Sequence, residues 1–104
     1  MKKSFSVLVV DDSRDMLELI RRQLQDIQIN PFISDNVLEA IEILETTTID
    51  LLISDVNMPN IGGEQLIRYT SEHFPKIPIL VISGYPNIEV AVNVMKMGAL
   101  EYLV

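Results

Sequence analysis

The 104-residue chain has no cysteine, no apolar stretch long enough to cross a bilayer and no cluster of basic residues. Without cysteine, neither a disulfide framework nor a thiolate metal site can form, and a reducing cytoplasm is the expected compartment. A membrane-spanning helix needs about 20 consecutive apolar residues, so we expect no contact with a membrane. The net charge is −7, and the eight Lys and Arg residues are scattered. This balance argues against direct binding of nucleic acid by the domain.

Short apolar runs alternate with segments of helical spacing, and this pattern predicts one α/β domain over residues 1–104. An apolar fraction of 48% is ample for a core. Pro31 cannot donate a hydrogen bond to a sheet ladder, so its strand belongs at an edge. The expected strands are Phe5–Val10, Asn30–Ser34, Leu51–Ser54, Pro78–Ile82 and Tyr102–Val104. The expected helices run from Met16 to Ile27, from Val37 to Leu44, over Glu64–His73 and over Ile88–Met97.

Capping signals support the predicted helix boundaries. Asn36 precedes the second helix, and Glu39 is placed to bond back to it in a capping box. Gly98 follows the last predicted helix, where glycine is favoured because the backbone turns left-handed. Ser13 is a good cap for the first helix, which leaves the two preceding aspartates for another role.

Three of the predicted strands end on hydrophilic side chains. Asp11 and Asp12 follow the first strand, Asp55 follows the third, and Ser83 follows the fourth. The carboxyl ends of parallel strands meet at one edge of the sheet, where open α/β sheets bind ligands. Converging carboxylates repel one another unless a cation holds them, and hard oxygen ligands suit Mg²⁺. The pattern therefore predicts a magnesium site for metal-assisted phosphoryl chemistry.

Each of these residues also has a purely structural explanation. Asp55 could stabilise the loop after its strand, and Asp11 or Asp12 could cap the next helix. Ser83, which precedes Gly84, could simply belong to a turn. Their occurrence at the ends of separate strands favours the chemical role. Phosphoryl transfer depends mainly on positioning and charge neutralisation, so a fixed carboxylate such as Asp55 is an adequate nucleophile beside a metal ion.

Four segments, in order along the chain, carry a resemblance to a known family. They are Val7–Asp12, Ser54–Pro59 with glycines at 62 and 63, Val81–Gly84, and Gly98–Leu103. Together they resemble the receiver domain of two-component response regulators. The resemblance implies a flavodoxin-like, doubly wound parallel sheet with strand order 2-1-3-4-5. Receiver domains also carry a lysine and a final helix beyond the position of Val104, so we expect residues 1–104 to be a C-terminally incomplete receiver domain of a longer protein.

The resemblance implies a phosphorylation site and its metal ligands. Asp55 would accept a phosphoryl group from the phosphohistidine of a sensor histidine kinase. Asp12 and Asp55 would bind Mg²⁺ directly, together with the backbone carbonyl of Asn57, while Asp11 would act largely through water. The domain would then be a switch in a phosphorelay that controls an output domain or partner. It would not be an enzyme, because it would catalyse only its own phosphorylation and dephosphorylation.

The resemblance also implies how the switch would be transmitted. Ser83 would hydrogen-bond a phosphoryl oxygen, and Tyr102 would turn inward when Ser83 moves. A tyrosine at that position could equally be an ordinary packing residue.

The segment Ile88–Met97 is apolar around most of its circumference, although a helix on one sheet face needs only a stripe. We expect a homodimer through this helix or through the sheet face that the missing final helix would leave uncovered. Alternatively, a neighbouring helix covers the surplus apolar surface.

Two other functions remain open from the sequence. A Mg²⁺-dependent phosphatase of the haloacid-dehalogenase kind also uses an aspartate nucleophile. Those enzymes place a second aspartate two residues later, where this chain has Asn57, and no insertion is available to form a cap. A receiver-like interaction or dimerisation module that is never phosphorylated would act only through its surfaces. The intact set of acids argues against it for a longer parent protein. For residues 1–104 alone it stays open, because a shortened sheet would expose apolar surface and invite pairing with another chain.

Overall fold

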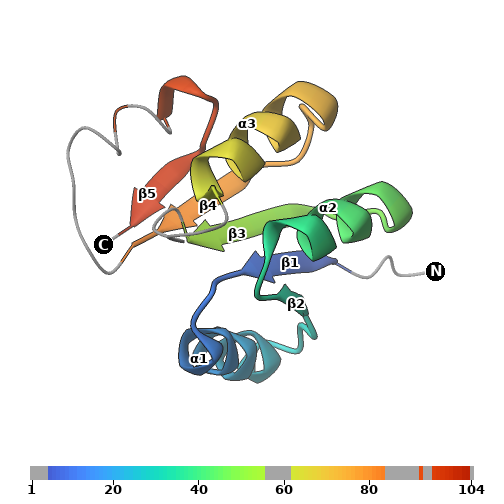
Figure 1. The fold of residues 1–104 in the computed structure, drawn as a ribbon. Helices are drawn as coiled ribbons and strands as arrows, with labels where there is room; N and C mark the ends of the chain where they lie inside the picture. The colour runs from blue at the N-terminus through green and yellow to red at the C-terminus, as the bar shows by residue number, and fades with distance from the viewer. Residues whose placement is uncertain (1–4, 56–61, 84–91, 93–94, 104) are drawn as a thin grey trace.

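A parallel five-stranded sheet forms the centre of the molecule (Figure 1). The computed structural model describes residues 5–55, 62–83, 92 and 95–103. Its strands are β1 (Val7–Val10), β2 (Phe32–Ser34), β3 (Leu51–Asp55), β4 (Ile79–Ile82) and β5 (Glu101–Leu103). They lie in the order β2-β1-β3-β4-β5, and all neighbouring pairs are parallel. The strand order 2-1-3-4-5 is therefore confirmed.

The strands differ from the predicted apolar runs only at their ends. Phe5 and Ser6 precede β1, Pro78 precedes β4, and β3 extends one residue further, to Asp55. β2 begins after Pro31 and lies at an edge, as the missing N–H donor requires. β5 begins one residue earlier than predicted, at Glu101. All four residues of β1 are buried, because this strand has a neighbour on each side and helices over both faces.

Helices lie on both faces of the sheet (Figure 1). α1 (Arg14–Asp26) covers one face, and α2 (Val37–Thr46) and α3 (Gly63–His73) cover the other. Most of the predicted helix Ile88–Met97 lies outside the described residues. Gly98 has a φ of 111°, and its N–H donates to the carbonyl of Met95 at 3.1 Å, as expected for a residue that ends a helix. No described helix is long and apolar enough to cross a membrane.

Alternating side chains of β1 divide the core into two clusters. Val7 and Val9 pack on one face with Leu17 of α1, whereas Leu8 and Val10 pack on the other face with α2 and α3. All four β1 side chains are completely shielded from solvent. Burial of a Val or Leu side chain contributes about 1.5–3 kcal/mol, and a one-residue slip would turn each β1 side chain to the opposite face. The core therefore fixes the strand register, and with it the positions of the strand ends.

The predicted cap of α2 is present, with one change of partner. The side chain of Asn36 accepts a hydrogen bond from the N–H of Glu39 at 2.8 Å. The N–H of Asn36 donates to Ser34 Oγ at 3.3 Å, where the capping box predicted the Glu39 side chain. Ser34 Oγ also donates to the carbonyl of Asn36 at 2.8 Å. The Ser34 hydroxyl therefore bonds both the N–H and the carbonyl of Asn36 and stabilises the turn from β2 into α2.

The face that carries α1 is less well covered over β4 and β5. Leu80 and Ile82 are half-buried there, and Leu103, which pairs with Ile82, is 45% exposed. On the opposite face, Ile79 and Val81 of β4 are almost fully buried. The side chains of β4 and β5 on the α1 face are therefore less buried than those of β4 on the opposite face.

Candidate metal centre

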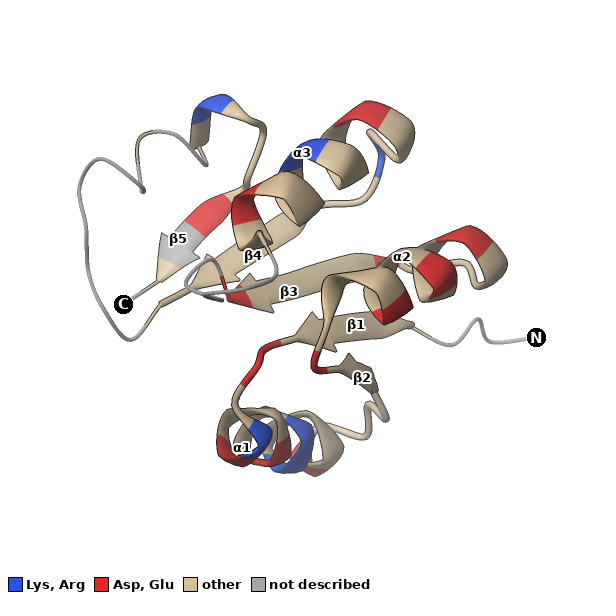
Figure 2. Cartoon of the chain, in the orientation of Figure 1, with Lys and Arg blue, Asp and Glu red and all other residues tan. Residues whose placement is uncertain are grey.

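The carboxylates of Asp11, Asp12 and Asp55 converge at the carboxyl edge of the sheet. One carboxylate oxygen from each residue lies within 4.8 Å of the other two. Val10 pairs with Ser54, so β1 and β3 reach this edge side by side and place the following aspartates together. Figure 2 shows the acidic positions at the ends of β1, β2 and β3 on one side of the sheet. The structure thus brings together the three acids that the sequence singled out.

Asp11 is the most buried acid of the cluster. It is 4% exposed, whereas Asp55 is half-buried and Asp12 is exposed. The pKa of Asp11 is raised from 3.8 to about 6, mainly because the carboxyl is buried. The negative charges of Asp55 and Asp12 also raise this pKa, whereas the hydrogen bond from the Ser13 backbone lowers it. A cation placed among these oxygens would relieve this repulsion. The electrostatics therefore favour a bound divalent ion.

Ser13 provides the side-chain cap of α1. Its Oγ accepts a hydrogen bond from the N–H of Met16 at 3.2 Å. The N–H of Ser13 donates to Asp11 Oδ1 at 2.8 Å, so Asp11 also stabilises the turn into the helix. The capping alternative therefore applies to Asp11 only in part, and the structure places Asp11 both in the turn and in the acidic cluster.

Ser83 lies at the same edge as the acids. The residue before it, Ile82, pairs with Asp55 across β4 and β3. Ser83 is 6% exposed, and its backbone N–H donates to the carbonyl of Leu103 at 2.9 Å. The end of β4 is thereby tied to β5 directly beside the acidic cluster.

Two further predicted residues are described only partly or not at all. Asn57 lies outside the described residues, as does the side chain of Tyr102. The backbone of Tyr102 belongs to β5 and pairs with Val81 of β4. In the predicted partner helix, Val92 and Met95 are each 45% exposed.

Sequence reasoning missed a fourth acid at this edge, Asp35. It directly follows β2, and its carboxylate lies 3.2 Å from the guanidinium of Arg14 in the first turn of α1. Its position directly after a predicted strand could have marked Asp35 as a candidate site residue, as it did for the other acids. That strand is short and weakly apolar, so its pattern gave little reason to place Asp35 at the same edge of the sheet.

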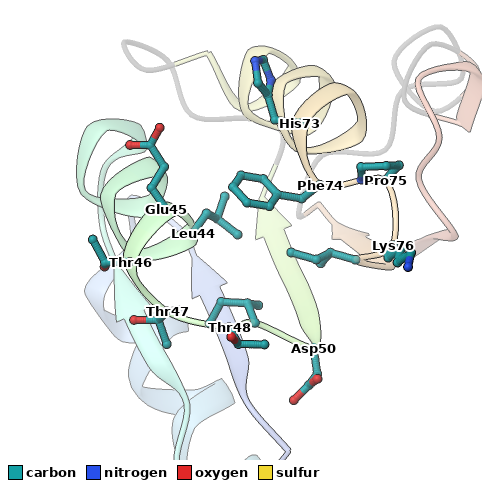
Figure 3. Close-up of a pocket in the computed structure, with 12 residues that line it drawn as sticks. Leu44, Glu45, Thr46, Thr47, Thr48, Asp50, His73, Phe74, Pro75 and Lys76 are labelled. Atoms are coloured by element: carbon teal, nitrogen blue, oxygen red, sulfur yellow. The ribbon is translucent and has the colours of Figure 1, made fainter.

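A groove of about 660 Å³ lies at the opposite end of the sheet, between the C-terminal ends of α2 and α3 (Figure 3). Its lining includes Leu44, Glu45, Asp50, His73, Phe74 and Ile77. Its two acids already have hydrogen-bond partners, since Tyr69 donates its hydroxyl to Glu45 at 2.9 Å and the N–H of Ser6 donates to Asp50 at 2.8 Å. None of the three clustered acids, Asp11, Asp12 and Asp55, lines this groove, so it is separate from the acidic cluster.

Comparison with known proteins identifies the family. The family model described as "Response regulator receiver domain" matches residues 7–104. The chain belongs to this family. A putative NtrX-like response regulator of Rickettsia felis is 34% identical to this receiver domain over 99 residues, which are 93% of this chain and 21% of the relative. The receiver domain thus spans about a fifth of the length of the curated relatives that it matches.

Solved structures confirm the receiver fold. A response regulator receiver protein from Pseudomonas putida has a TM-score of 0.91 at 31% identity, covering 99% of this chain and 88% of that one. A response regulator from Burkholderia pseudomallei, described with a phosphorylated aspartic acid, a calcium ion and citrate, has a TM-score of 0.89 at 28% identity. That match covers 96% of this chain and 59% of the other.

Proposed function

We propose that this receiver domain is a signalling switch that accepts a phosphoryl group on Asp55 from a sensor histidine kinase. The observation that carries the proposal is the convergence of the Asp11, Asp12 and Asp55 carboxylates within 4.8 Å. Asp55 ends the central strand β3, so the sheet fixes its backbone beside the ends of the neighbouring strands. The Burkholderia relative, described with a phosphorylated aspartic acid and a calcium ion, supports the same chemistry here.

The donor set fits Mg²⁺. It consists of three carboxylates, and Mg²⁺ prefers oxygen ligands supplied by one or two carboxylates and water. In this proposal Asp12, Asp55 and the backbone carbonyl of Asn57 would hold the ion directly, and Asp11 would act largely through water. When bound, the ion neutralises the charge that gathers as the phosphoryl group approaches Asp55.

The reaction is a transfer between two carriers. A carboxylate oxygen of Asp55 forms a bond to phosphorus while the bond from phosphorus to the histidine nitrogen of the kinase breaks, and the imidazole takes up a proton. The product is an acyl phosphate, which water later hydrolyses to free Asp55 and inorganic phosphate. The hydroxyl of Ser83 donates a hydrogen bond to a phosphoryl oxygen. The domain acts only on itself, so we do not class it as an enzyme.

The signal leaves the site through β5. Ser83 is joined to Leu103 by a backbone hydrogen bond of 2.9 Å, and Leu103 follows Tyr102 directly. Movement of Ser83 toward a phosphoryl group would bias the position of Tyr102 and of the segment 88–97. We propose that this shift controls an output domain or a homodimer. The contact would form through segment 88–97 or through the less covered sheet face. In this proposal the domain works in the cytoplasm and does not itself bind nucleic acid.

The test is phosphoryl uptake from labelled acetyl phosphate by the full-length protein in the presence of Mg²⁺. Wild-type protein takes up label, Asp55→Asn does not, and chelation of Mg²⁺ abolishes uptake by wild type. The matched control is Asp26→Asn, which removes an exposed acid at the end of α1 and retains labelling. Undiminished labelling of Asp55→Asn would overturn the assignment, and steady turnover of a generic phosphate ester would favour a phosphatase instead.

A further inference from the structure

Arg14 is the described basic residue that lies nearest in sequence to the acidic cluster. It begins α1, two residues after Asp12, and its guanidinium lies 3.2 Å from the carboxylate of Asp35. The next basic residues of α1, Arg21 and Arg22, pair with Glu18 further along the helix. The other described basic residues lie in later segments: Arg68 in α3, Lys76 before β4, and Lys96 before β5.

The contacts of Asp35 place Arg14 at the rim of the metal centre. Asp35 follows Ser34, and the carbonyl of Ser34 accepts a hydrogen bond from the N–H of Asp11 at 3.1 Å. Asp11 in turn belongs to the acidic cluster with Asp12 and Asp55. The ion pair therefore joins the start of α1 to the residue after β2, two residues from Asp12 on one side and one residue from Ser34 on the other.

The pair between Arg14 and Asp35 contributes little to stability. The Arg14 side chain is 80% exposed and that of Asp35 is 39% exposed. Exposed ion pairs contribute about 0–1 kcal/mol, so the guanidinium can leave Asp35 at small cost. The side chain is thus a weakly held cation beside a strongly anionic site.

A phosphoryl donor is itself an anion, and the acids at this edge repel it. Asp11, Asp12, Asp35 and Asp55 place four acidic side chains at the strand ends. A cation at the rim raises the local concentration of an anionic substrate. Guanidinium also presents several N–H donors in a planar fork that matches phosphate oxygens.

We propose that Arg14 attracts and orients the incoming phosphoryl group, exchanging its contact with Asp35 for a contact with a phosphoryl oxygen. This inference rests on the proposed phosphorylation of Asp55. Asp35 competes with the donor for the same guanidinium, so it limits how readily Arg14 engages. The two residues together form a donor-binding pair outside the metal centre.

The experiment measures initial rates of Mg²⁺-dependent phosphorylation of the full-length protein over a range of acetyl phosphate concentrations. At roughly 10 mM ionic strength, Arg14→Gln lowers the rate at subsaturating donor about three- to tenfold, mainly by raising KM, and the loss shrinks at roughly 1 M salt. Arg14→Lys keeps part of the rate, because it retains the charge but not the fork. Asp35→Asn raises the rate about two- to threefold by releasing Arg14. The matched control is Arg22→Gln, which removes one positive charge of α1 at its pair with Glu18 and leaves the rate near that of wild type.

A structural role alone would not produce this dependence on salt and on donor concentration. Equal rates for Arg14→Gln and Arg22→Gln at low salt, with normal labelling of Asp55 in wild type, would overturn only this inference. Absence of label from wild-type Asp55 would overturn the proposed function and this inference with it.

Discussion

The backbone N–H of Ser13 donates a hydrogen bond to Asp11 Oδ1 at 2.8 Å, and the hydroxyl oxygen of the same serine accepts from Met16 at 3.2 Å. Ser13 thus caps α1 with its side chain and holds Asp11 with its backbone. Asp11 is fixed within the acidic cluster, where burial raises its pKa to about 6. We therefore expect both the stability of the domain and its affinity for Mg²⁺ to depend on pH.

The first prediction concerns stability in the absence of metal. The pKa of Asp11 is about 6 in the folded protein, against an ordinary aspartate value of 3.8, so between these values the folded state holds a proton that the unfolded state has lost. The stability that the protonated carboxyl contributes is present below pH 3.8 and is lost as pH rises through 6, with a total on the order of 2–3 kcal/mol. Asp11→Asn, which stays neutral, is therefore more stable than wild type at pH 7 by about that amount, and the gap closes near pH 4.

Urea denaturation at pH 7 and near pH 4, with a chelator present, measures this difference. Asp26→Asn, which removes an exposed acid of α1, is the control for the loss of one charge. A constant difference between Asp11→Asn and wild type at both pH values would contradict the shifted pKa.

The second prediction concerns the affinity for Mg²⁺. Metal binding requires ionised carboxylates, so protons compete with the ion as pH falls through the pKa of Asp11. We expect binding about tenfold weaker at pH 5 than at pH 7, as measured by isothermal titration calorimetry. Identical dissociation constants at the two pH values would mean that Asp11 has no part in the metal site.

The third prediction separates Ser83 from the metal ligands. Ser83→Ala removes a hydroxyl from a buried position at the end of β4 and leaves the three acids in place. We expect unchanged Mg²⁺ affinity and phosphoryl uptake slowed roughly 10–100-fold, the effect of losing one hydrogen bond to a charged group. Ser83→Thr keeps the hydroxyl and retains most of the rate. Parallel losses of metal affinity and uptake in Ser83→Ala would instead indicate a disturbed strand end.

The fourth prediction concerns the turn after α1. Gln28 has a φ of 66°, in the left-handed region that favours glycine. Gln28→Gly should raise the free energy of unfolding by about 0.5–1 kcal/mol because it removes this strain. Gln23→Gly, at an exposed position within α1, should lower it by about 1 kcal/mol. Urea midpoints of the two variants should thus move in opposite directions, and a destabilised Gln28→Gly would contradict the explanation.

Much of the fold follows from local patterns in the sequence. The apolar runs predict the strands, and Pro31 predicts that β2 lies at an edge. Strand ends are less predictable: Phe5 is as apolar as a strand residue, but it precedes β1 and is 54% exposed. Whether a neighbouring strand extends far enough to pair with such a residue is decided by the register, which the local pattern does not contain.

The acidic cluster was predictable for the same reason as the sheet, because Asp11, Asp12 and Asp55 each follow a strongly apolar run of residues. The pair between Arg14 and Asp35 was not. Its members are 21 residues apart and exposed, so neither periodicity nor burial marks them. Only the packing of α1 beside the end of β2 brings them together.

The central claim is that the phosphoryl group resides on Asp55 beside a divalent ion. Borohydride reduction of the phosphorylated full-length protein converts an aspartyl phosphate to homoserine, which peptide mass spectrometry can locate. We expect homoserine at position 55, formed only when Mg²⁺ was present during phosphorylation. Homoserine at position 11 or 12, or at position 55 without any requirement for a divalent ion, would contradict it.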